Sequence, residues 1–494
     1  MNRDLFRISC FVLRILTKVM LYIILIFTLV LRLITINQSL WLDEAIGALA
    51  VRNMSYSDLI TGFLTVDNHP PLYYFLLKFW TGIFGYSEIS LRMPSVLFGV
   101  GTVFFIYLIG NRIFDSKKSG LIAAVLLSSS QLHIYYSQEA RMYSMVAFFA
   151  VLAVYSFLHL FEDRSNFKYW LLFSSSITVM VFTDYMPVFL LPAFFIYAIF
   201  QKHKKNWWYK FMLSFVPIIL AGIIWFPIFQ KQSAGGLWLM QTLPEWKNLA
   251  GGANLKQLLL VWMKFTLGRI SFTDKTLYYL ITVIASIPNA ILFANAMKSY
   301  KKNKLLLLWL LIPILLSFLI SVFFPAFIYF RLLFVLPAFY LIAAISVGNM
   351  KSGRILAGML IAINLVSCVI YYTDDFQKRE MWREAVTYVE NRIADNEIVI
   401  FSYPEPFAPY RWYEKKEYLS FGATDSIKTE KVNASDKTRE LVSNVSGVYY
   451  FEYLNDLSDP TRIVMNVIVE NGFTEKEVIG DFNGVGVIYH FVRE

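Results

Sequence analysis

Two adjacent carboxylates, Asp43 and Glu44, follow the first long apolar run of the chain, in the string SLWLDE that begins at Ser39. Charge at the edge of a hydrocarbon layer is costly, so such groups are candidates for function, and one of them can accept a proton from an incoming hydroxyl. The structural alternative is a helix N-terminus whose acidic residues complement the helix dipole.

His69 lies in the string HPPLYY, where the two prolines set a rigid entry into the next helix. Its imidazole can donate to a phosphate or a sugar hydroxyl, or it can simply be solvated.

Arg141 lies in the string SQEARMYS, together with Glu139 and Tyr143. The planar fork of an arginine binds phosphate oxygens bidentately; alternatively, Arg141 pairs with Glu139 or reaches lipid phosphates.

Other charged residues are candidates for the same kind of site. Arg331 begins an apolar run on the side where basic residues are not expected, and it is a second cation candidate for an anion. Lys264 and Arg269 are weaker candidates, for which contact with lipid headgroups is the simpler role. Asp184, in a very short turn, is either a polar ligand or an ordinary loop residue. The sequence shows no zinc motif, Walker loop, GxGxxG element or GxSxG elbow, so nothing requires a metal, nucleotide or other cofactor. A divalent cation remains an open alternative.

The composition indicates the kind of protein that must position these residues. The chain has 494 residues, of which 57% are apolar and only 16% are charged, and its mean hydropathy is +0.53. Soluble domains carry about 25% charged residues, so the sequence predicts a polytopic membrane protein. From residue 371 onward, 14 Lys and Arg face 22 Asp and Glu, a net charge of −8, which leaves +18 for the rest of the chain. This division follows membrane topology and gives no sign of nucleic-acid binding.

Eleven apolar runs are predicted to cross the membrane. They lie near residues 16–36, 90–110, 120–136, 144–161, 169–184, 185–201, 210–228, 277–297, 305–323, 331–349 and 355–372. Basic residues cluster in alternate gaps, which places those gaps and the N-terminus in the cytoplasm and the C-terminus outside. The outer loops are then 37–89 and 229–276. Apolar stretches at 72–85 and 255–268 are too short to span, so we expect helices lying in the outer interface.

The tail after the last predicted span has a different pattern. Helical periodicity covers 382–393, and strands are predicted at 397–402, 447–453 and 484–492. The sequence therefore divides into a membrane domain, 1–372, and a small α/β domain outside the membrane, 373–494.

Five strings in this order resemble one known family. They are LWLDEA at 40–45, HPPLYY at 69–74, LRMPS at 91–95, HIYYSQEARMYS at 133–144 and FRLLFVLPAF at 330–339. They resemble bacterial membrane glycosyltransferases related to the dolichyl-phosphate-mannose protein mannosyltransferases and the lipid A aminoarabinose transferases.

The resemblance implies a GT-C type fold in the plasma or inner membrane, with an outward-facing cavity and a sugar donor on a polyprenyl phosphate. It implies that Asp43 is the catalytic base and Glu44 its companion. His69, Arg141 and Tyr143 would contact the donor phosphate or sugar. Glu139 and Arg331 are further candidates for this donor site because of their charge and position in the sequence. Histidine before the paired prolines favours a neutral hexose. The acceptor is left open between lipid, glycan and protein.

One base and a lipid phosphate leaving group favour a single displacement with inversion at the anomeric carbon. Cations that neutralise the leaving phosphate would replace a strong general acid. Two rival functions remain. A lipid or sugar transporter would also have many helices and a few buried charges, though its ionisable residues usually lie near mid-membrane. A receptor or assembly protein without catalysis would use the tail for binding.

Overall fold

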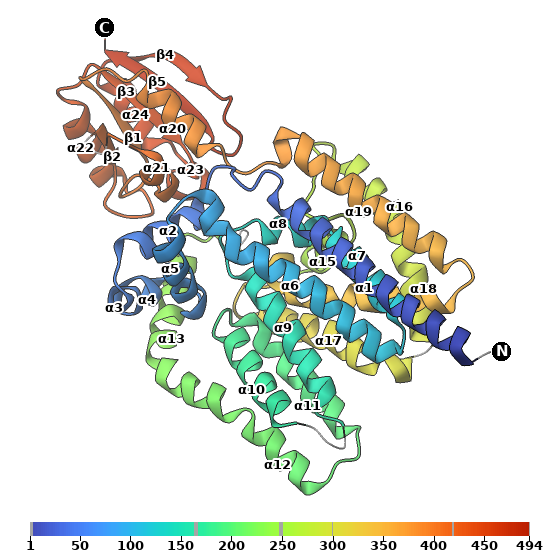
Figure 1. Cartoon of the computed structure of the whole chain (residues 1–494). Coiled ribbons are helices and arrows are strands. Elements are labelled where there is room, and N and C mark those ends of the chain that lie inside the picture. The colour runs from blue at the N-terminus through green and yellow to red at the C-terminus, as the bar shows by residue number, and fades with distance from the viewer. Residues whose placement is uncertain (1–2, 163–165, 247–249, 299, 417–418, 494) are drawn as a thin grey trace.

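The structure is a computed structural model that describes residues 3–162, 166–246, 250–298, 300–416 and 419–493. A large helical bundle carries a small domain of strands and helices at one end, beside the first helices that follow α1 (Figure 1). Seven described helices are long and apolar enough to cross a membrane. They are Ile15–Leu33, Glu88–Phe114, Lys205–Thr242, Lys275–Met297, Asn303–Ile320, Tyr329–Asn349 and Gly353–Thr373. Seven of the eleven predicted spans coincide with them.

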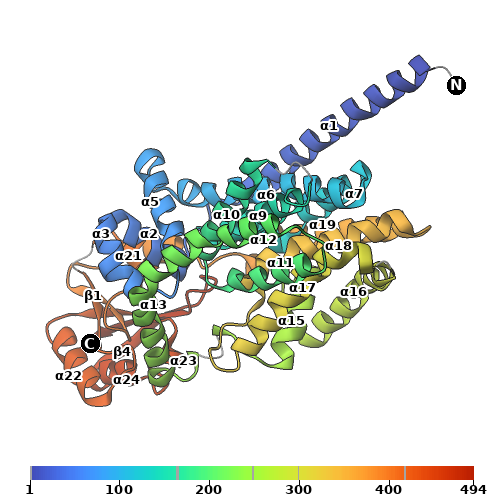
Figure 2. The same ribbon diagram turned by 90° about the horizontal axis from the view of Figure 1, so that it is seen from below.

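The full bundle follows the predicted order of apolar runs. Its helices are α1 (Arg3–Leu33), α6 (Glu88–Phe114), α7 (Lys117–Ser128), α8 (Gln131–Ser137), α9 (Tyr143–His159), α10 (Phe167–Val181), α11 (Leu191–Ile199), α12 (Lys205–Leu213), α13 (Val216–Thr242), α16 (Lys275–Met297), α17 (Tyr300–Ile320), α18 (Leu336–Asn349) and α19 (Gly353–Thr373). Two 3-10 helices, η2 (Met186–Leu190) and η3 (Tyr329–Val335), precede α11 and α18. Figure 2 shows α1 projecting beyond the rest of the bundle at its N-terminal end.

The predicted span at 120–136 is interrupted. α7 ends at Ser128 and α8 begins at Gln131. Backbone groups freed by such a break need partners inside the bilayer. The Asn364 amide nitrogen of α19 donates to the Leu126 carbonyl at 3.1 Å, and the Arg32 guanidinium of α1 donates to the Ser128 carbonyl at 3.4 Å. The break is therefore covered by other helices.

One predicted helix is longer than expected. The run at 210–228 continues as α13 to Thr242, into the predicted outer loop. The reason is tertiary: the Gln232 side chain is buried and donates to the carbonyl oxygens of Leu64 and His69, at 2.7 and 2.9 Å. The C-terminal half of α13 thus packs against the first loop, a contact that no local pattern encodes.

The first loop, after α1, is helical. It contains α2 (Leu42–Asn53), α3 (Tyr56–Asp58), the π-helix η1 (Leu59–Phe63), α4 (Leu64–Val66) and α5 (Leu72–Phe84). α5 and α15 (Leu255–Leu267) are the two short apolar helices that the sequence predicts. Both end at a glycine with positive φ, Gly85 and Gly268, a conformation that costs other residues strain.

The C-terminal region is a five-stranded sheet in the order β2-β1-β3-β5-β4. Its strands are β1 (Glu397–Phe401), β2 (Ser420–Gly422), β3 (Gly447–Glu452), β4 (Phe473–Ile479) and β5 (Val487–Arg493). β2, β1 and β3 are parallel, whereas β5 runs antiparallel to both β3 and β4. β1, β3 and β5 match the predicted strands, and β2 and β4 were not predicted.

Helices cover both faces of this sheet. α20 (Trp382–Glu390) and α21 (Ala408–Tyr413) share one apolar cluster with it, built around Trp382, Phe401 and Phe451. α22 (Lys431–Val442) and α24 (Ile463–Glu470) share the other, built around Ile400 and Tyr450. All five residues of β1 are buried, as is usual for a parallel strand between two helical layers.

Candidate active site

Glu44 is part of a closed ion pair. Arg92 of α6 donates from Nε to Glu44 Oε1 at 2.9 Å and from Nη2 to Oε2 at 2.6 Å, and the Ala140 N–H donates to Oε1 at 2.7 Å. Both side chains are almost completely buried. Although burial disfavours the charged form, Arg92 and Arg379 hold the pKa of Glu44 below its usual range. With its oxygens occupied in this way, Glu44 is placed to fix the loop and not to exchange protons.

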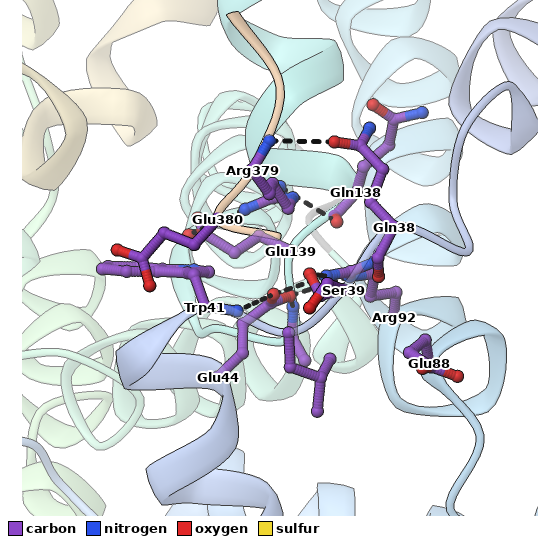
Figure 3. A network of polar contacts seen from close by, with 12 residues as sticks. Gln38, Ser39, Trp41, Glu44, Glu88, Arg92, Gln138, Glu139, Arg379 and Glu380 are labelled. Carbon is purple, nitrogen blue, oxygen red and sulfur yellow. Dashed lines mark hydrogen bonds and ion pairs between the residues drawn. The ribbon is translucent and has the colours of Figure 1, made fainter. Parts of the chain in front are cut away.

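Arg92 also holds the backbone that leads into α2. Its guanidinium donates to the carbonyl oxygens of Ile36, Gln38 and Ser39, at 2.7, 2.6 and 3.0 Å. The string LRMPS contains Arg92, but sequence reasoning assigned it no role. One buried arginine therefore sets the path of the chain between α1 and the two carboxylates (Figure 3).

Asp43 is the accessible one of the two carboxylates. Its side chain is 37% exposed, against 0% for Glu44. The Arg141 guanidinium lies 3.5 Å from Asp43 Oδ2, and it donates to the Asp43 carbonyl at 3.4 Å and to the Tyr74 hydroxyl at 3.2 Å. Arg141 Nε is buried and has no hydrogen-bond partner within the described part of the chain. Asp43 and Arg141 thus form an open pair of opposite charges.

His69 lies beside a carboxylate that the sequence analysis did not single out. His69 Nδ1 is 3.2 Å from Asp67 Oδ2, and both side chains are mostly buried. Burial raises the pKa of Asp67, but His69 and then Arg141 outweigh it, so that the pKa lies below its usual range. The string VDNHPP shows both residues. Asp67 therefore extends the group around Asp43 and Arg141.

Glu139 is a buried acid in the turn between α8 and α9. Its Oε1 lies 3.4 Å from Arg379 Nη1, whereas its Oε2 is buried without a partner among the described residues. Burial, reinforced by the charge of Glu44, raises the pKa of Glu139 to about 7 although Arg379 opposes the shift. Glu139 can therefore hold a proton near neutral pH.

Tyr143 and Arg331 approach the same place from α9 and η3. The Tyr143 ring packs edge-on against Tyr136 and Phe330, each with ring centres 5.3 Å apart. This packing brings Arg331, the residue after Phe330, to the start of α9. Arg331 Nε is buried and, within the described residues, has no hydrogen-bond partner.

These contacts place polar groups from the first loop, the α8–α9 turn and η3 at one end of the bundle. The comparisons with known proteins concern the same regions. Residues 68–229 match the family model of the dolichyl-phosphate-mannose-protein mannosyltransferases. An uncharacterized protein of Aquifex aeolicus is 31% identical over 162 residues, which is 32% of this chain and 32% of that protein. The matching segment thus spans about a third of the curated relative.

Solved structures match nearly the whole chain. ArnT from Cupriavidus metallidurans, in the apo state, aligns with a TM-score of 0.57 and 9% identity, over 96% of this chain and 97% of its own. The same protein bound to undecaprenyl phosphate aligns with a TM-score of 0.54 and 8% identity. The chain has the GT-C fold. The Archaeoglobus fulgidus oligosaccharyltransferase, crystallised with Zn and sulfate, aligns with a TM-score of 0.53 and 11% identity, over 94% of this chain and 73% of its own.

Within this GT-C fold, Lys264 and Arg269 lie near the end of α15. Lys264 Nζ donates to the carbonyl oxygens of Arg269 and Ile270, at 3.3 and 2.7 Å. Burial, and then the nearby Arg269 charge, lower the pKa of Lys264 to about 7. The Arg269 guanidinium lies 4.3 Å from the centre of the Tyr135 ring, and the Arg379 guanidinium lies at the same distance from that ring. Arg269 therefore borders α8, whereas Lys264 is held by the backbone that follows α15.

Asp184 has a local role. Its Oδ1 accepts the Met186 N–H at 2.9 Å, a hydrogen bond within the turn that leads into η2. In the parts of the chain that the structure describes, no hydrogen bond or ion pair joins Asp184 to Asp43, Arg141 or Glu139. The geometry thus favours the loop-residue alternative for Asp184.

The described residues include no group of three or more His, Cys, Asp or Glu side chains arranged to hold a metal ion. A hollow of about 440 Å³ lies between the C-terminal end of α13, the segment before α15 and the segment after α17, and its lining includes Gln241, Gly252, Asn254 and Ser321. An apolar hollow of about 470 Å³ lies between α11 and α13 and is lined by Leu191, Phe195 and Phe215 among others. Neither is lined by the charged residues described above, so the candidate site is defined by the convergence of polar groups.

Proposed function

We propose that this protein is a membrane glycosyltransferase that moves a sugar from a polyprenyl-phosphate donor to an acceptor hydroxyl at the outer face of the membrane. The observation that carries the proposal is the open pair of Asp43 and Arg141: an accessible carboxylate beside a buried guanidinium with unused donor capacity. The match of residues 68–229 to a mannosyltransferase family and the ArnT-like fold support it. The ArnT structure with undecaprenyl phosphate shows that a protein of this fold holds such a lipid.

Asp43 is the proposed base. Its carboxylate would accept the proton of the acceptor hydroxyl as the oxygen attacks the anomeric carbon. Glu44 would not compete for this role because Arg92 and the Ala140 N–H occupy its oxygens. Asp43 also lies in the first turn of α2, so that the Glu44–Arg92 pair fixes the direction of the base through the helix.

The proposed leaving-group site is cationic. Arg141 and Arg331 each have a buried Nε without a partner among the described residues, and Arg269 faces an aromatic ring instead of a carboxylate. Fixed cations in a water-poor site stabilise charge that develops on a leaving phosphate.

The proposed reaction is a single displacement. The bond from the anomeric carbon to the phosphate oxygen breaks as the bond to the acceptor oxygen forms, which inverts the anomeric carbon. His69 favours a neutral hexose, and the acceptor is a lipid, a glycan or a protein.

The test is Asp43→Asn in the full-length protein, reconstituted into liposomes with cell-envelope acceptors. Polyprenyl-phosphate-linked mannose and glucose, each radiolabelled, serve as separate donors. We expect Asp43→Asn to lower transfer at least 100-fold while binding of undecaprenyl phosphate changes less than threefold, because the base acts only in the chemical step. The matched control is Asp436→Asn, an exposed carboxylate of α22 whose loss should leave transfer unchanged.

Near-wild-type transfer by Asp43→Asn would exclude Asp43 as the base. Movement of the labelled lipid across the bilayer without release of its sugar would instead indicate a transporter. The anomeric configuration of the product, measured by NMR, checks the proposed inversion.

A further inference from the structure

The segment between the membrane bundle and the sheet reaches into the candidate site. It includes Arg379 and Glu380, which precede α20 and lie beside the first loop and the α8–α9 turn (Figure 3). Sequence analysis assigned these residues no role, because they belong to the tail that follows the last predicted span. Their partners lie about 240 to 340 positions earlier in the chain.

Arg379 joins three separate segments. Its side chain is only 1% exposed, and it donates to the carbonyl oxygens of Tyr135 and Gln138 at 3.2 and 3.1 Å and faces Glu139 at 3.4 Å. Its backbone N–H donates to the Gln38 side chain at 2.9 Å. The buried guanidinium thus fixes the turn that leads to Arg141, whereas the backbone of Arg379 holds the loop that leads to Asp43.

Glu380 holds the start of α2. Its Oε2 accepts the N–H of Leu42 at 3.3 Å and the indole N–H of Trp382 at 2.7 Å. The Tyr453 hydroxyl, which follows β3, lies 3.1 Å from Oε1. Leu42 is the residue immediately before Asp43, so the Glu380 carboxylate fixes the backbone position from which the proposed base projects.

Further contacts extend the same attachment. The Leu40 N–H donates to the Tyr413 hydroxyl at 2.8 Å, and the Arg383 N–H donates to Ser39 Oγ at 3.0 Å. Tyr413 ends α21, which follows β1, and Tyr453 follows β3. The carboxyl ends of β1 and β3 are therefore the edge of the sheet that faces the first loop. The connections after β1 and β2 run over opposite faces of the sheet, through α21 and α22. In open α/β sheets the carboxyl ends of strands at such a point are the usual place for binding. Here it holds a loop of the same chain.

We infer that Arg379 and Glu380 are positioning residues for the transfer reaction: Glu380 orients Asp43 through the start of α2, and Arg379 orients Arg141 through the α8–α9 turn. This inference rests on the proposed function. Neither residue is required to touch the reacting atoms. Burial raises the pKa of Glu380 to about 7, and the nearby charge of Asp43 acts in the same direction, yet three hydrogen-bond donors still converge on its oxygens. An amide oxygen at this position could accept the bonds from Leu42 and Trp382 equally well.

The experiment compares Glu380→Ala with Glu380→Gln in the reconstituted full-length protein. Glu380→Ala should lower turnover about tenfold and leave the affinity for undecaprenyl phosphate within twofold, because the base is displaced but the cations remain. Glu380→Gln should keep turnover within threefold of wild type. A residue that transferred protons would lose activity in both variants, so the rescue by glutamine separates positioning from acid–base catalysis.

Arg379→Ala tests the second half of the inference. We expect turnover to fall at least tenfold. Arg379→Lys should not restore it, because the single nitrogen of an ammonium group cannot replace both Nη1, which faces Glu139, and Nη2, which donates to the Tyr135 and Gln138 carbonyl oxygens. Exposed residues of the same domain provide matched controls. Arg439→Ala removes an arginine that pairs with Asp436, and Glu477→Gln changes a glutamate that accepts a hydrogen bond from the Tyr388 hydroxyl. Both controls should transfer sugar at the wild-type rate.

Tyr453→Phe and Tyr413→Phe test the same attachment with smaller changes, in case Glu380→Ala or Arg379→Ala fails to fold. Each removes only one hydroxyl group. Each should lower turnover two- to fivefold and lower the thermal midpoint by only a few degrees, because one buried hydrogen bond is lost. Full turnover in Glu380→Ala and Arg379→Ala, alongside an inactive Asp43→Asn, would overturn this inference alone. Wild-type transfer in Asp43→Asn would instead overturn the function on which it rests.

Discussion

At the scale of single residues, the neighbouring carboxylates Asp43 and Glu44 have opposite surroundings. Glu44 is enclosed by Arg92 and a backbone N–H, whereas Asp43 is open and faces Arg141. The sequence could indicate this pair of carboxylates. It could not show which of them is enclosed, because Arg92 and Ala140 lie 48 and 96 positions from Glu44 in the chain. The same distance in sequence explains why Arg92, Arg379 and Glu380 were missed. Asp67 was visible two residues before His69 and could have been found from the spacing alone.

Arg92→Ala should destabilise the protein strongly. Removing one partner of a buried ion pair leaves the other charge uncompensated, and the loss is about 3 kcal/mol or more of the free energy of unfolding. The thermal midpoint in detergent should fall by several degrees. Arg112→Ala removes a partly exposed pair with Glu162 and should change the midpoint far less. Equal midpoints for the two variants would contradict the role given to Arg92.

Glu139 should make stability depend on pH. Its pKa is raised to about 7 in the folded protein, chiefly by burial, so the folded state holds a proton that the unfolded chain releases near pH 4.5. Its contribution is therefore fully present below about pH 4.5 and is lost as the pH rises toward 7. Glu139→Gln lacks this titration. The thermal midpoint of Glu139→Gln minus that of wild type should increase between pH 4.5 and 7.5, and a constant difference would contradict the assignment.

At the scale of elements, the apolar runs predict most helices of the bundle and the two short apolar helices α5 and α15. Length and hydrophobicity are local properties, and they need no tertiary information. The extension of α13 depends on Gln232 and carbonyl groups of the first loop, so a window of apolar residues could not predict it. β2 has three residues, and β4 lies at the sheet edge with five exposed residues in its middle. Neither shows the buried apolar pattern that identifies β1.

The contact between α6 and α7 depends on two glycines. A Cβ added to Gly120 would lie 2.6 Å from the Tyr107 carbonyl oxygen, and one added to Gly110 would lie 2.9 Å from the Gly120 Cα. Small residues let membrane helices approach closely. Gly120→Ala should lower the thermal midpoint, whereas Gly222→Ala, in an open position of α13, should leave it unchanged or raise it. A higher midpoint for Gly120→Ala would refute the close approach.

At the scale of the whole molecule, the GT-C fold unites a helical bundle with an α/β region whose parallel strands point toward the first loop. Charge asymmetry between the two parts leads us to propose that the N-terminus is cytoplasmic and that the sheet lies outside. The predicted boundary between the two parts, near residue 372, lies at the end of α19, whose last residue is Thr373.

Labelling with a membrane-impermeant maleimide tests this orientation in intact cells. Single cysteines replace Asp436 in α22 or Lys117 at the start of α7, in a chain whose Cys10 and Cys368 are changed to serine. We expect Asp436→Cys to react in intact cells and Lys117→Cys to react only after permeabilisation. The reverse pattern would place Asp43 on the cytoplasmic side and remove the proposed access to its substrates.

The interruption between α7 and α8 has a consequence for biosynthesis. Carbonyl groups at this break accept hydrogen bonds from Arg32 of α1 and Asn364 of α19, and the Tyr372 hydroxyl of α19 donates to the Leu31 carbonyl of α1 at 2.5 Å. A nascent chain that has inserted everything up to α18 still lacks half of this cover. We therefore expect the bundle to reach its final packing only after the ribosome has delivered α19, and the α/β region follows directly behind the helix that completes this packing.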